Sequence, residues 1–253
     1  NILVSGYTGD LSYNQVTMGT TVPTGNNKNN SSETWENDTK GNYTKVFQGT
    51  SASAPVVSGA IALVLEACPI LTYRDVKYLI AKTAIQTSST FTTNSAGLKH
   101  SNDTGYGLIN VKGMIDMCKA IGYTNLSAIH SDSGINSDQE VISSTTVSKD
   151  IIITKNLKVE WVGLTISIES DFLEDLEVKL ISPSNTESIL LHANNALGTS
   201  DTRLGKTAKN QFTTGFRLSS VAFIDESSMG TWEVKITSRN AKLTNLQLEV
   251  VGY

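Results

Sequence analysis

The residue types best suited to chemistry stand together in one short string, Gly49-Thr50-Ser51-Ala52-Ser53-Ala54-Pro55. A serine hydroxyl becomes a useful nucleophile only when a base takes its proton and a donor stabilises the oxyanion that follows attack. A serine at the amino end of a helix supplies such a donor, because its backbone N–H has no partner inside the helix and the helix dipole is positive there. The string therefore offers Ser51 as a candidate nucleophile at a helix start, whereas a bare Gly-Thr-Ser is more often a simple helix cap.

The sequence after Ser51 predicts the helix that positions it. Residues 52–67 are apolar on nearly every side, which is typical of a helix buried inside a domain. Ser58, Gly59 and Glu66 interrupt this apolar run, and no stretch reaches the roughly 20 apolar residues of a membrane span. We therefore expect a core helix and no membrane span.

Further helices and strands are predicted on both sides of the string. A second helix is expected after Thr72, with Asp75 completing a capping box, and a third helix over residues 111–120. The second helix has an inward stripe of three apolar residues, Val76, Leu79 and Ile80. Ahead of the string, residues 2–4 predict a buried strand, and a long polar loop follows with one embedded strand around residues 43–47.

The second half of the chain has the pattern of a β-sandwich. From Asp150 onward apolar and charged residues alternate with a period of two, as half-buried strands do. The clearest runs are 176–180, 232–236 and 246–250. Within residues 159–168 the apolar phase shifts at Gly163, which predicts a β-bulge there. Short strands without helices favour a sandwich, led by a Ser- and Asp-rich linker or loose strand at 125–149.

The longer serine string carries a family resemblance. Followed by Ser58-Gly59-Ala60 and an apolar helix, it resembles the serine motif of subtilisin-like proteases. Leu-Glu-Ala at 65–67 and Leu-Thr-Tyr-Arg-Asp-Val at 71–76 resemble the furin/kexin branch in particular. So does His100-Ser101 ahead of Gly105-Tyr106-Gly107-Leu108. This resemblance runs through residues 1–120.

The second half resembles the P domain of the same family, at residues 175–185, 223–232 and 246–252. In that family the P domain is a jelly-roll-like β-sandwich packed beside the catalytic domain and needed for its stability. The resemblance implies an α/β, incomplete subtilisin-like catalytic domain over residues 1–124. An all-β sandwich, the P domain with its leading linker, then follows over residues 125–253. A secreted, periplasmic or cell-surface protein is also implied.

The resemblance implies a serine endopeptidase that hydrolyses protein or peptide substrates through an acyl-enzyme on Ser51. The Ser51 backbone N–H and the Thr50 hydroxyl would support the oxyanion hole. Because the triad order in this family is Asp, His, Ser, the Asp, the His and the oxyanion Asn are expected upstream of Asn1. That amino-terminal part is either joined to this chain or held as a separate fragment. None of the three histidines is expected to be the base: His100, His130 and His192.

Two other functions stay open. One is a non-catalytic protein that keeps the protease fold for binding or scaffolding. The other is a stability and targeting fragment whose P domain is a binding module. The serine motif is intact through Pro55, and this favours the protease over both.

Calcium is the cofactor that the resemblance implies, in a structural role. The candidate ligands are Asp171, Glu174 and Asp175, because loops rich in carboxylates suit Ca²⁺. Their spacing is not that of an EF-hand, and a solvated acidic turn is the commoner explanation of such a cluster.

The remaining features are less specific. A net charge of −4 argues against a nucleic-acid partner. Cys68 and Cys118 are either a disulfide or two buried thiols. Val22 stands where furin-like enzymes carry an acidic residue in a Thr-Thr-Asp segment, so a basic P1 preference is not implied. The chain opens without an initiator Met or a signal peptide, so we expect a piece of something longer.

Overall fold

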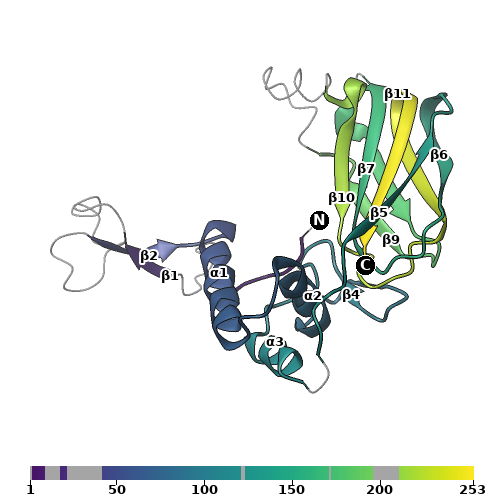
Figure 1. Ribbon diagram of the computed structural model, residues 1–253. Helices are drawn as coiled ribbons and strands as arrows, with labels where there is room; N and C mark the ends of the chain where they lie inside the picture. Colours follow the sequence, from purple (N-terminus) through teal and green to yellow (C-terminus); the bar gives the residue numbers. More distant parts are fainter. Residues whose placement is uncertain (1, 9–17, 22–41, 121–122, 171, 196–210) are drawn as a thin grey trace. The chain divides into compact units, whose positions relative to one another are not determined.

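The computed structural model describes residues 2–8, 18–21, 42–120, 123–170, 172–195 and 211–253. The chain divides into two compact units (Figure 1). The first, which we call the helical unit, consists of residues 4–85 and 108–123. The second, the sandwich unit, consists of residues 1–3, 86–107 and 124–253.

The described residues of the helical unit form one small sheet and three helices. Its strands β1 (Met18–Thr21) and β2 (Tyr43–Phe47) form an antiparallel pair. The helices are α1 (Thr50–Ala67), α2 (Tyr73–Thr83) and α3 (Val111–Cys118). The predicted strand at 43–47 and the predicted helices are therefore confirmed, although α3 ends two residues earlier than expected.

Local signals at the start of α2 act as the sequence predicts. The Thr72 side chain accepts a hydrogen bond from the Asp75 N–H, and the Asp75 carboxylate accepts the Thr72 N–H at 2.7 Å. This is a capping box, which satisfies two helix-end donors at once. The three residues of the predicted stripe are all buried: Val76, Leu79 and Ile80.

Helix α1 is much less covered than its composition predicts. Among its residues only Ala52 and Val64 are buried, while Leu63 is 56% exposed and Leu65 39% exposed. The prediction of a helix buried inside a domain is therefore wrong for the described residues, because they supply cover on one side only. By length and composition alone α1 could also cross a membrane, a test that core helices pass as well.

The predicted buried strand at residues 2–4 is also wrong. These residues form no strand, and Ile2 is 44% exposed. The Leu3 carbonyl accepts the Tyr106 N–H at 3.0 Å, and Ser5 makes an isolated parallel bridge with Leu108. A run of residues forms a strand only where it pairs at successive positions, and these single contacts do not extend into such a ladder in the described part of the chain.

Among the described residues, the β-sandwich of the sandwich unit is built from seven antiparallel strands. They are β5 (His130–Asn136), β6 (Glu140–Ile153), β7 (Val159–Ser170), β8 (Glu177–Ile181), β9 (Glu187–Leu191), β10 (Phe216–Ser220) and β11 (Gly230–Gly252). The first half of β11 pairs with β6 and β8, and its second half pairs with β5 and β7. Strand β9 adds to β8, and β10 adds to β7. The long β11 therefore runs through both layers (Figure 1), and the predicted jelly-roll-like sandwich is confirmed.

The two layers enclose one apolar core. Its largest fully buried side chains include Trp232, Phe212 and Phe223. The Trp232 indole N–H donates to the Ser228 carbonyl at 2.8 Å, and its ring meets Phe223 edge to face with centroids 5.0 Å apart. The core thus buries aromatic surface without leaving the indole donor unpaired.

The register irregularity in β7 lies three residues before the predicted one. Gly163 pairs regularly with Glu249, whereas the ladder skips Glu160 between Val159 and Trp161. The predicted bulge at Gly163 is therefore wrong. Gly163 has another role, since a β-carbon there would lie 2.7 Å from Nη2 of Arg217. The glycine provides room for the guanidinium above the strand.

A short hairpin belongs to the sandwich unit although it precedes the sandwich in sequence. Strands β3 (Thr92–Thr93) and β4 (Lys99–His100) pair antiparallel within residues 86–107. We call residues 86–107 the docked hairpin.

Three groups attach the docked hairpin to the sandwich. Asn94 is buried and donates to two carbonyls of the sandwich. The Ser95 N–H donates to the buried Glu226 carboxylate at 2.8 Å, and the Tyr106 hydroxyl donates to the Val221 carbonyl at 2.6 Å. Burial raises the pKa of Tyr106, so the phenol remains a donor across the ordinary pH range.

Candidate active site

Ser51 lies in the first turn of α1 with its side chain exposed. The helix is preceded by Gly49, whose φ of 76° is in the left-handed region and whose position carries no side-chain cap. Glycine adopts this conformation without strain. Ala52, directly after the serine, is fully buried, so the turn is fixed from below while Ser51 faces outward.

The backbone N–H of Ser51 is available as a hydrogen-bond donor. The N–H groups of Ala52 and Ser53 both donate to the Gly49 carbonyl, at 3.0 and 3.2 Å. The Ser51 N–H has no hydrogen-bond partner among the described residues. A free N–H at a helix amino end, where the dipole is positive, suits a developing oxyanion.

The other residues of the serine string have simpler positions. Thr50 is the first residue of α1 and is exposed, and its hydroxyl makes no hydrogen bond to the described part of the chain. Its role in an oxyanion hole therefore stays a prediction. Pro55 lies inside α1, and because proline has no N–H it cannot bond to the Ser51 carbonyl.

None of the three histidines belongs to the helical unit that carries Ser51. His100 is buried, its Nε2 lies 3.0 Å from the Ile2 carbonyl oxygen, and its ring meets Tyr106 edge to face. Burial lowers the pKa of His100, so the neutral imidazole donates at Nε2. His130 and His192 are exposed.

The predicted calcium site stays a prediction, because one of its three ligands is not among the described residues. Asp171 lies outside them. Glu174 and Asp175 lie on the short helix η2 (Leu173–Asp175), and the Asp175 carboxylate forms an ion pair with Arg239 at 2.7 Å. The Arg239 guanidinium therefore neutralises the Asp175 charge that a bound cation would otherwise neutralise. No group of three His, Cys, Asp or Glu that could hold a metal occurs in the described part of the chain.

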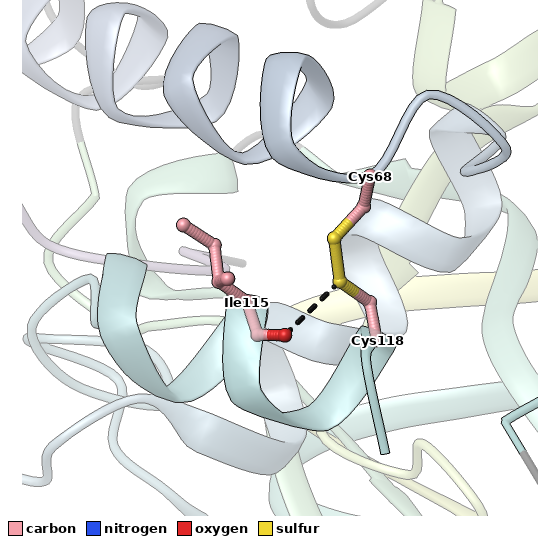
Figure 2. Close-up of a disulfide and its surroundings, with 3 residues drawn as sticks. All are labelled: Cys68, Ile115 and Cys118. Carbon is pink, nitrogen blue, oxygen red and sulfur yellow. Dashed lines mark hydrogen bonds between the residues drawn. A yellow bond between two sulfur atoms is a disulfide. The ribbon is translucent and has the colours of Figure 1, made fainter. Parts of the chain in front are cut away.

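Two other sequence features have clear outcomes. Cys68 and Cys118 form a disulfide, which settles the alternative that the sequence left open (Figure 2). The bridge joins the residue after α1 to the last residue of α3, where Sγ of Cys118 lies 3.2 Å from the Ile115 carbonyl oxygen. Val22, on which the P1 argument rested, lies outside the described residues.

Sequence reasoning missed two contacts of the serine turn. The Thr8 hydroxyl donates to the Gly49 carbonyl at 3.1 Å, and Gly6 lies against Ser53 and Val57. Both residues precede the motif by more than 40 positions, and no local pattern marks them. The neighbouring Ser5 makes a parallel bridge with Leu108, but this pairing too can be seen only in the structure.

Family comparisons agree with this geometry. Residues 3–107 match the model of the Subtilase family, and residues 159–250 match that of the proprotein convertase P-domain. The chain therefore carries a portion of a subtilase followed by a proprotein convertase P-domain. Its relatives are subtilisin-like serine endopeptidases, kexins and proprotein convertases among them.

Individual relatives cover different parts of the chain. The PC3-like endoprotease variant B of Hydra vulgaris is 36% identical over 58% of this chain, and kexin of Saccharomyces cerevisiae is 29% identical over 79%. The extracellular serine protease of Aeromonas sobria is 30% identical over 79% of the chain. This chain spans 22%, 25% and 37% of those three relatives.

A solved structure gives the same fold. The crystal structure of the serine protease of Aeromonas sobria matches 95% of this chain with a TM-score of 0.74 at 25% identity. The match covers 52% of that protein. A second crystal structure holds the Aeromonas protease in complex with a chaperone.

Proposed function

We propose that this chain is the carboxy-terminal part of a subtilisin-like serine endopeptidase whose nucleophile is Ser51. The observation that carries the proposal is the exposed Ser51 on the first turn of α1, inside the stretch that matches the Subtilase family. The free Ser51 N–H adds an oxyanion donor to the same residue.

In the proposed reaction the Ser51 Oγ attacks the scissile carbonyl and forms an acyl-enzyme, and water then hydrolyses it. The Ser51 N–H, helped by the Thr50 hydroxyl, receives the oxyanion. A base, an orienting carboxylate and an oxyanion amide come from an upstream portion. Protein or peptide substrates follow from the same proposal.

The surface of α1 supports an upstream portion. A helix that is apolar on nearly every side needs cover, and the described residues leave Leu63 and Leu65 substantially exposed. Since the chain spans about half or less of its relatives, we propose that the upstream half supplies this cover.

Replacing Ser51 tests the proposal directly. In protein expressed with its upstream coding sequence, we expect a fluorophosphonate probe to label Ser51 and Ser51→Ala to abolish labelling. Peptide hydrolysis should fall by about 10⁶-fold in kcat, as loss of the nucleophile does in such triads. Ser58 is an exposed serine further along α1, and Ser58→Ala should leave both the labelling and the peptide hydrolysis unchanged. A wild type that folds with its upstream half and stays unlabelled would favour the non-catalytic binding protein.

Calcium and secretion are further proposals. We propose structural Ca²⁺ in the assembled protease, outside the Glu174–Asp175 turn, because Arg239 already occupies Asp175. Chelation should then lower the Tm of the assembled protease, and Glu174→Gln should leave that calcium response unchanged. A Tm insensitive to chelation contradicts the proposal.

The disulfide fits a secreted, periplasmic or cell-surface protein, since such bonds persist in oxidising compartments.

A further inference from the structure

The segment ahead of the serine turn is held close against α1. A β-carbon on Gly6 would lie 2.6 Å from Cγ2 of Val57, 2.8 Å from Oγ of Ser53 and 3.1 Å from the Ser53 carbonyl oxygen. These distances leave no room for any side chain. The segment cannot easily retreat, because Ser5 on its other side accepts the Ile109 N–H at 3.0 Å. The backbone at Gly6 is therefore fixed against the first turns of α1.

Two residues further along, the same segment reaches the residue before α1. The Thr8 hydroxyl donates to the Gly49 carbonyl at 3.1 Å. This carbonyl also accepts the N–H groups of Ala52 and Ser53, so the hydrogen bonds that form the first turn of α1 meet at this one oxygen. Gly49 has no side chain and no side-chain cap, and its φ of 76° is one that glycine can leave at little cost.

We propose that Thr8 and Gly6 are positioning residues for the nucleophile, an inference that rests on the proposed function of Ser51. Thr8 fixes the rotation of the Gly49 peptide, and Gly6 lets the segment that carries Thr8 approach α1. The orientation of that peptide sets the direction of the next two residues and hence of the Ser51 Oγ and N–H. Reacting groups must be held to within about 0.5 Å, and a displacement of about 1 Å costs about 100-fold in rate.

The Thr8 hydroxyl is tested by two substitutions in protein expressed with its upstream coding sequence. Thr8→Val removes the hydroxyl and keeps the side-chain shape, whereas Thr8→Ser keeps the hydroxyl. We expect Thr8→Val to lower the second-order rate of fluorophosphonate labelling at Ser51 about 3- to 10-fold, the range that one hydrogen bond allows. The kcat for a peptide substrate should fall equally and KM should stay within about twofold, while Thr8→Ser restores all three values.

Gly6 supplies a second measurement with a matched control. Gly6→Ala should slow labelling more than Thr8→Val does, by about 100-fold, because the added methyl would overlap the side chains of Val57 and Ser53 and press on the Ser53 carbonyl in the first turns of α1. Ser133→Thr adds one methyl at an exposed position of β5, outside the serine motif and outside α1, and it should label as the wild type does. Circular dichroism checks that each variant keeps its helices.

The outcomes separate the two proposals. A wild type that is not labelled at Ser51 overturns the proposed function and this inference with it. A labelled wild type whose Thr8→Val variant reacts equally fast overturns the inference alone. A slow Thr8→Val that Thr8→Ser does not rescue, or a change confined to KM, also overturns it.

Discussion

Removing the disulfide is expected to lower the free energy of unfolding of the helical unit by about 4 kcal/mol. The bridge links Cys68 and Cys118, which are 50 residues apart, so it closes a long loop in the unfolded chain. In the chain-entropy account a loop of this length corresponds to about 4 kcal/mol at 25 °C. Both cysteines are buried, and the bond joins the end of the helix that begins at Ser51 to the end of α3. The bond therefore fixes the carboxy-terminal end of α1 to α3 covalently.

The measurement is urea unfolding of Cys68→Ala combined with Cys118→Ala, followed by circular dichroism at the helical band. Alanine avoids placing hydroxyls at two buried positions. The helical signal reports mainly on α1, α2 and α3, since the helical segments in the described residues of the sandwich unit are at most four residues long. Reducing the wild type with dithiothreitol should give the same shift. A variant that unfolds within about 1 kcal/mol of the oxidised wild type contradicts the prediction.

The parts of the fold that sequence predicted well are those set by neighbours along the chain. The capping box of α2 joins Thr72 to Asp75, three positions away, and both halves of it were predictable. The alternation of the sandwich strands is equally local, because side chains on a strand alternate with a period of two. Helix α1 was predictable as a helix for the same reason. Its exposure was not, because burial depends on what lies beside a helix and not on its composition.

The contacts that position the serine turn show the opposite case. Thr8 meets Gly49 across 41 residues, and nothing in either residue's surroundings marks the pair. The β7 irregularity was predicted in the right strand but at Gly163 instead of Glu160, since the apolar phase constrains a shift only to within a few positions. Candidate chemistry could therefore be read from the motif, whereas the supporting residues required the fold.

The docked hairpin depends on one buried amide. Asn94 Nδ2 donates to the carbonyls of Ala222 and Ile224, at 3.1 and 2.9 Å, across 128 and 130 residues. Its Oδ1 accepts the N–H groups of Ala96 and Leu98 at 3.1 and 2.9 Å. One side chain thus closes the hairpin turn and attaches it to the sandwich.

Asn94→Ala is therefore expected to weaken the docking of the hairpin by about 3 kcal/mol, because it leaves two carbonyls and two N–H groups without partners in a buried place. By the tenfold-per-1.4 kcal/mol rule this is about a 100-fold faster hydrogen exchange in the docked hairpin. The amides to follow are those of Ser101 and Gly105, which bond to each other's carbonyls and not to Asn94. Asn102→Ala, at an exposed position of the same segment, is the matched control and should exchange as the wild type does. Unchanged protection of Ser101 and Gly105 in Asn94→Ala would show that the contacts of Ser95 and Tyr106 hold the hairpin without the amide.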